Sequence, residues 1–531
     1  METFDLIIRN GQLHRGDGSP HASVDLAVKN DKIIKIHRGI PEKGKTEINA
    51  RGFAVSPGFI DVHSHSHAEL LVNRNAESKI RQGITTEISG NCGMSPYPLS
   101  KSNYAEWHDR HVSLFGIKTD WNSLGSFFEQ LENPGISINY GVFTGHGDLR
   151  TVVMGKNNRH PASSELKQMK ALLKETLDQG SLGLSTGLEY APGSYADTDE
   201  LITLCKSMKS LGGRYASHIR NEGDFLEEAV GEVIRICHEA DIPVQISHLK
   251  ACNTPNWHKA EHIITNINEM IEQGYPVGVD RYPYTAYGTT LEIFLPLWSR
   301  EGGTDKILDR LNDPSACKKI QEYTNLKISH MGGPDRVLIS YVRHDKNRHW
   351  EGYSVKQGAE ETGLEPFDFI KKLLIDDDNG VEIAGFAMSE ENTEMILAQP
   401  WVSIGSDSVT WAPYGILNIG NPHPRDYGSF PRVLGYYRRE KNLFSLEEAI
   451  HKITYLPAKQ MGLIKRGLLE EGYYADIAIF DPETIRDTAT FVKPKQYPEG
   501  IHTVIVNGKI ILQNGIHSGT RSGKILRNGG T

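Results

Sequence analysis

The chain has 531 residues, of which 38% are apolar and 24% charged, and its formal net charge at pH 7 is -9. This balance excludes a globally disordered chain, and the acidic charge argues against a nucleic-acid partner. No apolar run reaches the ~18 residues of a membrane-spanning helix, and the N-terminal residues carry no signal-peptide pattern. Five cysteines are too few for a disulfide framework. We therefore expect a multidomain cytoplasmic protein without a membrane partner.

Both ends of the sequence have the pattern of short β-strands separated by turn residues. Strand-like residues flank Asn10-Gly11 and Asn30-Asp31 near the start and precede Asn507-Gly508 near the end, and these pairs are typical of hairpin turns. Because chain termini tend to lie close together, residues 1–55 and 465–531 are predicted to form one small β-sandwich domain. The residues from Ser518 onward are rich in Gly, Ser and Arg and are predicted to be loose.

The middle of the chain alternates between short apolar strands and longer helical segments. This alternation predicts a parallel sheet with crossover helices. Eight strands suggest an α/β fold of the (β/α)8 TIM-like barrel type over residues 56–464, with an inserted lid or subdomain at about residues 285–380. The expected strands are Gly58–His63, Ile84–Ser89, Ile138–Thr144, Gly183–Ser185, Arg214–His218, Val244–His248, Val277–Tyr282 and Trp401–Asp407. The expected helices between them include Glu165–Gln179, Thr198–Ser210, Leu226–Ala240 and Lys259–Gln273.

Histidines and one carboxylate stand at the ends of these predicted strands, where a barrel carries its chemistry. His63 and His65 are two positions apart and share one face of the first strand. His218 and His248 each end a strand in successive units, and Asp407 ends the last strand. Any one of these histidines alone is more often a packed or hydrogen-bonded residue than a ligand. Together they favour a divalent metal site, with Asp407 as a ligand or as the general base.

Several motifs containing these residues resemble the amidohydrolase superfamily, and more closely its N-acyl-D-amino-acid deacylase (D-aminoacylase) family. The first is the strand Pro57-Gly58-Phe59-Ile60-Asp61-Val62-His63-Ser64-His65, and the most specific is Gly90-Asn91-Cys92-Gly93 after the second strand. The resemblance covers nearly the whole chain and is weakest at about residues 295–380. Further matching segments are residues 145–150, 185–193, 217–222, 247–250, 280–284, 423–425 and 430–432.

The resemblance implies roles for individual residues. It implies a tight Zn²⁺ site at Cys92, His218 and His248, and a second, weaker metal site at His63 and His65. Asp407 would be the catalytic acid–base. The family pattern also assigns Arg425 to the substrate carboxylate and Tyr282 to the oxyanion, and Lys250 is expected to share the carboxylate or a nearby polar contact. Arg425 lies eighteen residues past Asp407 and is expected on the loop after the last strand. His67 replaces a residue that is often acidic in the family, and its role stays open.

Three functions remain under consideration. The leading hypothesis is zinc-dependent hydrolysis of an N-acyl-D-amino acid, a small-molecule substrate, to a carboxylate and a free D-amino acid. A cyclic-amide hydrolase of the dihydroorotase or hydantoinase kind is the alternative, although no suitable bridging lysine stands out around Gly183–Thr186. A non-catalytic scaffold of this fold would have lost its metal ligands. The preferred side chain, the number of metals and the oligomeric state are left open.

Overall fold

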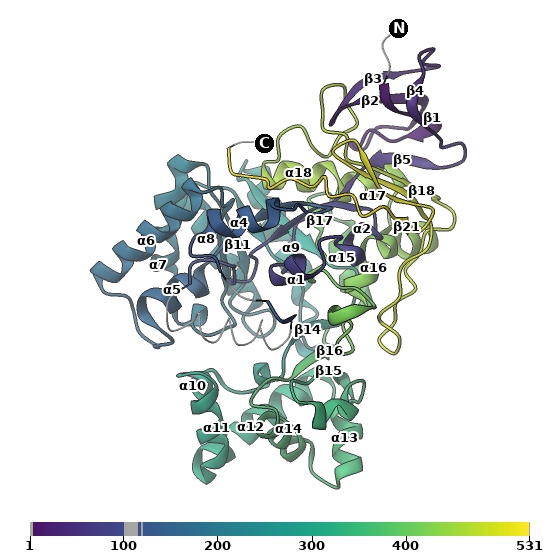
Figure 1. The fold of residues 1–531 in the computed structure, drawn as a ribbon. Coiled ribbons are helices and arrows are strands. Elements are labelled where there is room, and N and C mark those ends of the chain that lie inside the picture. Colours follow the sequence, from purple (N-terminus) through teal and green to yellow (C-terminus); the bar gives the residue numbers. More distant parts are fainter. Residues whose placement is uncertain (1–3, 100–114, 118–119, 530–531) are drawn as a thin grey trace.

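Strands from both ends of the sequence form one nine-stranded sheet in the computed structural model, which describes residues 4–99, 115–117 and 120–529 (Figure 1). The order is β21-β20-β19-β18-β5-β1-β2-β3, with β4 paired to β1. The central contact joins β5 to β18 in antiparallel register, so residues from the two ends share one sheet. The strands are β1 (Phe4–Leu13), β2 (Ala22–Lys29), β3 (Lys32–His37), β4 (Gly44–Asn49), β5 (Ala54–Pro57), β18 (Ile477–Phe480), β19 (Ile501–Val506), β20 (Lys509–Gln513) and β21 (Ile516–His517).

Two details of this region differ from the sequence prediction. Asn10-Gly11 is not a hairpin turn, because β1 continues through it and the register with β2 shifts there as a bulge. The segment after Ser518 is not loose either. Gly523 N donates to Ile136 O at 2.8 Å and Leu526 N to Tyr140 O at 2.7 Å. Ile525 and Leu526 are buried, so this polar-looking tail carries an apolar anchor.

The middle of the chain forms two parallel sheets whose strands follow the sequence order. One sheet is β6-β7-β8 and the other is β17-β13-β12-β11-β10-β9. β17 and β6 are joined by a parallel bridge between Ser64 and Ser408, and Asp407 N donates to His63 O at 2.8 Å. The bounds are β6 (Phe59–Asp61), β7 (Ile84–Ser89), β8 (Asn139–Val142), β9 (Thr144–Gly145), β10 (Gly183–Gly187), β11 (Arg214–His218), β12 (Val244–Ile246), β13 (Val277–Arg281) and β17 (Val402–Ile404).

Amphipathic helices connect these parallel strands and bury their apolar faces against them. In α8, for example, Leu226, Val230, Val233 and Cys237 recur at helical spacing and are all buried. None of the helices among the described residues combines the length and apolar character needed to cross a bilayer. The helices outside the insert are α1 (Ala68–Val72), α2 (Glu77–Ile80), α4 (Leu124–Glu132), α5 (His146–Met154), α6 (Ser163–Asp178), α7 (Thr198–Met208), α8 (Leu226–Ala240), α9 (Lys259–Glu272), α15 (Glu390–Ala398), α16 (Arg425–Arg432), α17 (Leu446–Ile453) and α18 (Tyr455–Met461).

Between β13 and α15 the chain leaves the parallel sheets and builds a separate unit. Figure 1 shows this unit at one end of the molecule and the nine-stranded sheet at the other. It has its own buried cluster, which includes Ile320, Ile339, Phe369 and Leu373. Its antiparallel sheet and helices are β14 (Tyr287–Thr290), β15 (Val337–Tyr341), β16 (Glu382–Gly385), α10 (Leu297–Arg300), α11 (Thr304–Asn312), α12 (Pro314–Met331), α13 (Val355–Thr362) and α14 (Pro366–Asp376).

Candidate metal centre

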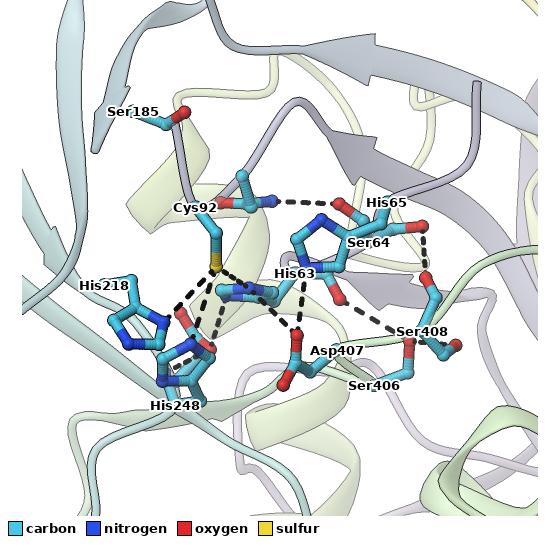
Figure 2. A network of polar contacts seen from close by, with 12 residues as sticks. His63, Ser64, His65, Cys92, Ser185, His218, His248, Ser406, Asp407 and Ser408 are labelled. Carbon is cyan, nitrogen blue, oxygen red and sulfur yellow. Dashed lines mark hydrogen bonds and ion pairs between the residues drawn. The ribbon is translucent and has the colours of Figure 1, made fainter. Parts of the chain in front are cut away.

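The Cys92 sulfur lies at the centre of a histidine cluster at the ends of the parallel strands. Its Sγ is 3.4 Å from His63 Nε2, 3.6 Å from His248 Nε2 and 3.7 Å from His218 Nδ1. Figure 2 shows these side chains pointing toward one another, with Asp407 facing them. All four are buried. The residues come from four different strand ends, so the fold brings together positions up to 185 residues apart, from His63 to His248.

Three of the site residues have a backbone conformation that side chains rarely adopt. Cys92 has φ +53°, His248 φ +36° and Asp407 φ +52°. Each follows a strand end, and the turn re-aims the side chain toward the shared centre. The Cys92 turn is held because Gly93 N donates to Ser185 Oγ at 3.1 Å. Residues kept in this region despite its cost are typical of functional sites.

Asp407 connects the histidines to Arg425. Its Oδ1 is 2.9 Å from His65 Nε2 and 3.4 Å from His63 Nε2, and its Oδ2 is 2.7 Å from Arg425 Nη1. Burial acts to raise the pKa of this carboxyl, but Arg425 and the hydrogen bond from His65 outweigh it and hold the pKa well below its usual value. In this arrangement Asp407 is an ionised carboxylate.

The Cys92 thiol is set up as a thiolate. Burial acts to raise its pKa, but the positive charge on His63 and the hydrogen bonds from His218 and His248 bring the pKa well below its usual value. Burial acts to lower the pKa of His63, but the negative charges of Asp280 and Cys92 outweigh it and raise the pKa well above its usual value. A thiolate among imidazoles is a ligand set that Zn²⁺ prefers.

Two carboxylates behind the histidines were not predicted from the sequence. Asp280 Oδ1 lies 3.2 Å from His63 Nδ1 and also accepts from His248 N at 2.9 Å. Glu222 Oε1 lies 3.1 Å from His248 Nδ1. Such carboxylates fix the ring orientation and tautomer of metal-binding histidines. A signal was available, since Glu222 and Asp280 lie within matched motifs, four residues after His218 and two before Tyr282.

A buried polar network supports the Asp407 turn from below. Lys79 Nζ donates to Asp61 Oδ2 and Ser406 Oγ, both at 2.7 Å, and to Ser408 Oγ at 2.8 Å. Gly405 lets this segment approach the first strand, because a Cβ there would lie 2.5 Å from the Cβ of His63. The network fixes Asp407 relative to His63.

The donor set fits a zinc ion. A thiolate and an imidazole on one tetrahedral Zn²⁺ lie ~3.6 Å apart, given bond lengths of ~2.3 and ~2.0–2.1 Å. The distances from Cys92 Sγ to His218 and His248 match this value. His63 Nε2 lies 3.4 Å from the sulfur, so it is as close as His218 and His248 are. Cys92 therefore lies between the tight metal site and the weaker site of His63 and His65 that the resemblance implied. The division of ligands between two sites stays a prediction.

The predicted substrate residues line a cavity of about 620 Å³ over this cluster. The prediction that Arg425 lies on a loop is wrong, because Arg425 is the first residue of α16. Its guanidinium lies 4.8 Å from the Tyr282 ring. Arg425 Nε and the Tyr282 hydroxyl are buried without hydrogen-bond partners among the described residues. Lys250 is engaged already, by an ion pair with Glu222 and a 2.8 Å contact with His248 Nδ1.

His67 also lines the cavity but does not join the cluster. β6 ends at Asp61, so His67 does not lie on a continued strand that would place it on the same face as His63 and His65. Its Nδ1 lies 3.1 Å from the Tyr140 hydroxyl and 3.3 Å from Ser89 Oγ.

Known proteins of one enzyme family are similar to this chain over nearly its whole length. The model of the Amidohydrolase family matches residues 379–512. A D-aminoacylase of Alcaligenes xylosoxydans xylosoxydans is 33% identical over 528 residues, covering 99% of this chain and 98% of that protein. An N-acyl-D-glutamate deacylase of Bordetella bronchiseptica, solved with zinc and a phosphonate inhibitor, matches with a TM-score of 0.84 and 31% identity, covering 99% of this chain and 100% of that one. A D-aminoacylase structure concerned with its binuclear metal centre has a TM-score of 0.83 and 32% identity over the same shares. This chain therefore belongs to the D-aminoacylase (N-acyl-D-amino-acid deacylase) family of metal-dependent amidohydrolases.

Proposed function

We propose that this protein hydrolyses N-acyl-D-amino acids to a carboxylate and a free D-amino acid in a zinc-dependent reaction. The observation that carries this proposal is a pair of buried donors that line the cavity beside the Cys92 cluster. Arg425 Nε and the Tyr282 hydroxyl have no hydrogen-bond partner within the described part of the chain. Buried donors of this kind are costly unless something binds them. A carboxylate and a polarised amide oxygen on one small molecule supply both acceptors.

Cys92, His218 and His248 would hold the tight Zn²⁺, and His63 and His65 would contribute to a second, weaker site. When bound, Zn²⁺ supplies a Lewis acid that polarises the scissile carbonyl and lowers the pKa of water. Asp280 and Glu222 orient His63 and His248 for this task.

Asp407 would act as general base and then as general acid. Its Oδ1 would take a proton from the attacking water and return it to the amine nitrogen, which must be protonated to leave. Arg425 now holds the pKa of Asp407 low through the 2.7 Å ion pair. A substrate carboxylate that binds Arg425 shares this guanidinium, which weakens the ion pair and makes Asp407 more basic when the substrate is present.

The two ends of the substrate would be fixed by different residues. Arg425 would grip the α-carboxylate with its planar fork, with Lys250 adding positive charge nearby, and Tyr282 would stabilise the developing oxyanion. With the amide at the metal and the carboxylate at Arg425, the cavity walls decide where the side chain fits. The insert contributes part of those walls, through Tyr287, Ile293, Leu326, Lys327 and Met331.

The overall architecture belongs to this proposal. The parallel pairings and the bridge from Ser64 to Ser408 support a (β/α)8 barrel over residues 56–464. The nine-stranded sheet supports a terminal β-sandwich domain at residues 1–55 and 465–531. The separate core supports an insert at about 285–380 that walls the cavity. A cytoplasmic location and a small-molecule partner complete the proposal.

The experiment is a panel of N-acetyl-D- and N-acetyl-L-amino acids, assayed by amine release after zinc reconstitution, with hydantoin and dihydroorotate alongside. We expect release from D-substrates in preference to their L-enantiomers. Faster hydrolysis of the cyclic amides would favour the alternative. Metal analysis of the same protein addresses the scaffold hypothesis, since a scaffold should bind none.

A further inference from the structure

A second cluster of metal-ligand residues lies away from the cavity, between the nine-stranded sheet and helix α17. His14 directly follows β1, and His21 directly precedes β2, so both belong to one hairpin loop. Glu447 lies in the first turn of α17, and His451 of the same helix contacts Gly16 O in this loop. Residues 433 positions apart in sequence, His14 and Glu447, thus meet at the junction of two parts of the fold.

The geometry of this cluster suits one ion. His14 Nδ1 lies 3.5 Å and His21 Nδ1 3.4 Å from the same oxygen, Glu447 Oε1. One ligand atom from each of the three residues lies within 4.8 Å of the others. Two ligands on a tetrahedral Zn²⁺ with bonds of ~2.0–2.2 Å lie ~3.3 Å apart. The distances to Glu447 therefore already approach the edges of a zinc tetrahedron.

His14 provides an independent indication of a ligand. Its side chain is only 2% exposed, and neither ring nitrogen has a hydrogen-bond partner among the described residues. A buried imidazole without partners is costly, and its Nδ1 points at Glu447. The His21 side chain is 43% exposed and the Glu447 side chain 23%, so an ion and a completing water can enter from solvent.

We propose that His14, His21 and Glu447 form a metal site for a divalent transition-metal ion, with Zn²⁺ the best match. Two imidazoles and one carboxylate plus water is a common zinc ligand set, whereas Mg²⁺ and Ca²⁺ prefer oxygen ligands. The bound ion would join the loop of residues 14–21 to α17, beside the existing contact of His451 Nδ1 with Gly16 O at 3.0 Å. It would brace the terminal sheet against the helix and take no part in the chemistry at Cys92.

The test counts Zn²⁺ per chain in the full-length protein, stripped of metal and dialysed against ZnCl₂, for the wild type and for His21→Ala and Glu447→Gln. These variants change accessible residues, which spares the buried His14. We expect each variant to bind one equivalent of Zn²⁺ less than the wild type. Losing an outer-shell partner of a metal ligand weakens metal affinity by up to ~100-fold, so losing a ligand itself should weaken Zn²⁺ affinity at this site by at least that factor. His262→Ala is the matched control, since His262 and Glu227 form an exposed pair at 2.9 Å with no third ligand among the described residues.

A local readout separates this site from the Cys92 centre. Zn²⁺ should slow amide hydrogen exchange in residues 14–21 of the wild type and of Cys92→Ala, but not of His21→Ala, and Mg²⁺ should not slow it. Equal zinc counts in the wild type and both variants, or exchange in residues 14–21 that Zn²⁺ leaves unchanged, would overturn the proposal.

Discussion

The strand-end cluster and the inserted unit face each other across the same cavity but are built in opposite ways. In the cluster, buried polar groups hold several of the side chains in place: Asp280 lies 3.2 Å from His63 Nδ1, and Lys79 donates to Ser406, directly before Asp407. The insert is built mainly around an apolar cluster, and it contacts the rest of the chain through polar pairs such as Tyr190 Oη with Thr289 Oγ1 at 3.1 Å. The wall that carries the Cys92 cluster, which we call the fixed wall, is therefore specified by polar contacts between residues from several strand ends. The insert wall can change its side chains without disturbing those contacts.

The largest expected effect comes from removing Cys92, the residue at the centre of the fixed wall. Cys92→Ala should lower turnover beyond the ~10⁴-fold upper range of a lost acid–base group, because the tight metal site itself is lost. Metal analysis and amine release measure the two losses together. Cys205→Ala, which changes a buried helix cysteine outside the site, should keep its metal. Full metal content in Cys92→Ala would show that the sulfur is not a ligand.

The next effect separates chemistry from metal binding on the same wall. Asp407→Asn keeps the size of the side chain but removes the base, so we expect turnover to fall by at least ~10²-fold. Metal content should change less than in Cys92→Ala. Near-normal turnover would mean that the base lies elsewhere.

Substitutions of Arg425 test whether this residue binds the substrate carboxylate. Arg425→Lys should weaken use of N-acetyl-D-amino acids because an ammonium group cannot form the two parallel hydrogen bonds of a guanidinium, and Arg425→Ala should weaken it more. The measurement is kcat/KM for a free-acid substrate and its neutral carboxamide. Loss should be greater for the acid, and equal proportional losses would show that Arg425 does not bind the carboxylate.

The smallest effect is expected on the insert wall. Leu326 lies on α12 and lines the cavity, whereas Leu364 follows α13 and does not. Leu326→Ala should change the ratio of kcat/KM between D-substrates with large and small side chains by about 10-fold, with metal content unchanged. Leu364→Ala is the matched control and should leave the ratio as it is. If both variants kept the wild-type profile, the insert would not set side-chain preference at this position.

The sequence identified the residues that meet in the cluster better than the residues that support them. His63, His218 and His248 could be found because each follows an apolar strand, and parallel strand ends meet at one edge. Lys79 could not, because its partners Ser406 and Ser408 lie 327 and 329 positions away and no local pattern joins them. Arg425 was expected on the loop after the last strand because it lies eighteen residues past Asp407, yet it begins helix α16, with Pro424 as the N-cap.

In the sheet that the two ends of the chain share, two details differ from what the sequence predicted. Asn10-Gly11 has the composition of a turn, but the hairpin partner β2 pairs on both sides of it, and a bulge absorbs the extra residue. The segment after Ser518 was predicted to be loose because it is rich in glycine and serine. It also contains Ile525 and Leu526, and the burial of these two residues fixes the segment. Composition averages over a window and therefore misses short anchors.

The pairing of β5 with β18 also constrains how the chain can fold. Ser56 donates to Ala478 O, 422 positions away, so this sheet cannot form until most of the polypeptide has been synthesised. Contacts of such separation carry a high loop-closure cost and slow folding. Until β18 is available, the edge of β5 that pairs with it stays open, which is a state prone to aggregation. Expression conditions that slow aggregation during synthesis should therefore raise the yield of folded protein more than changes that stabilise the finished fold.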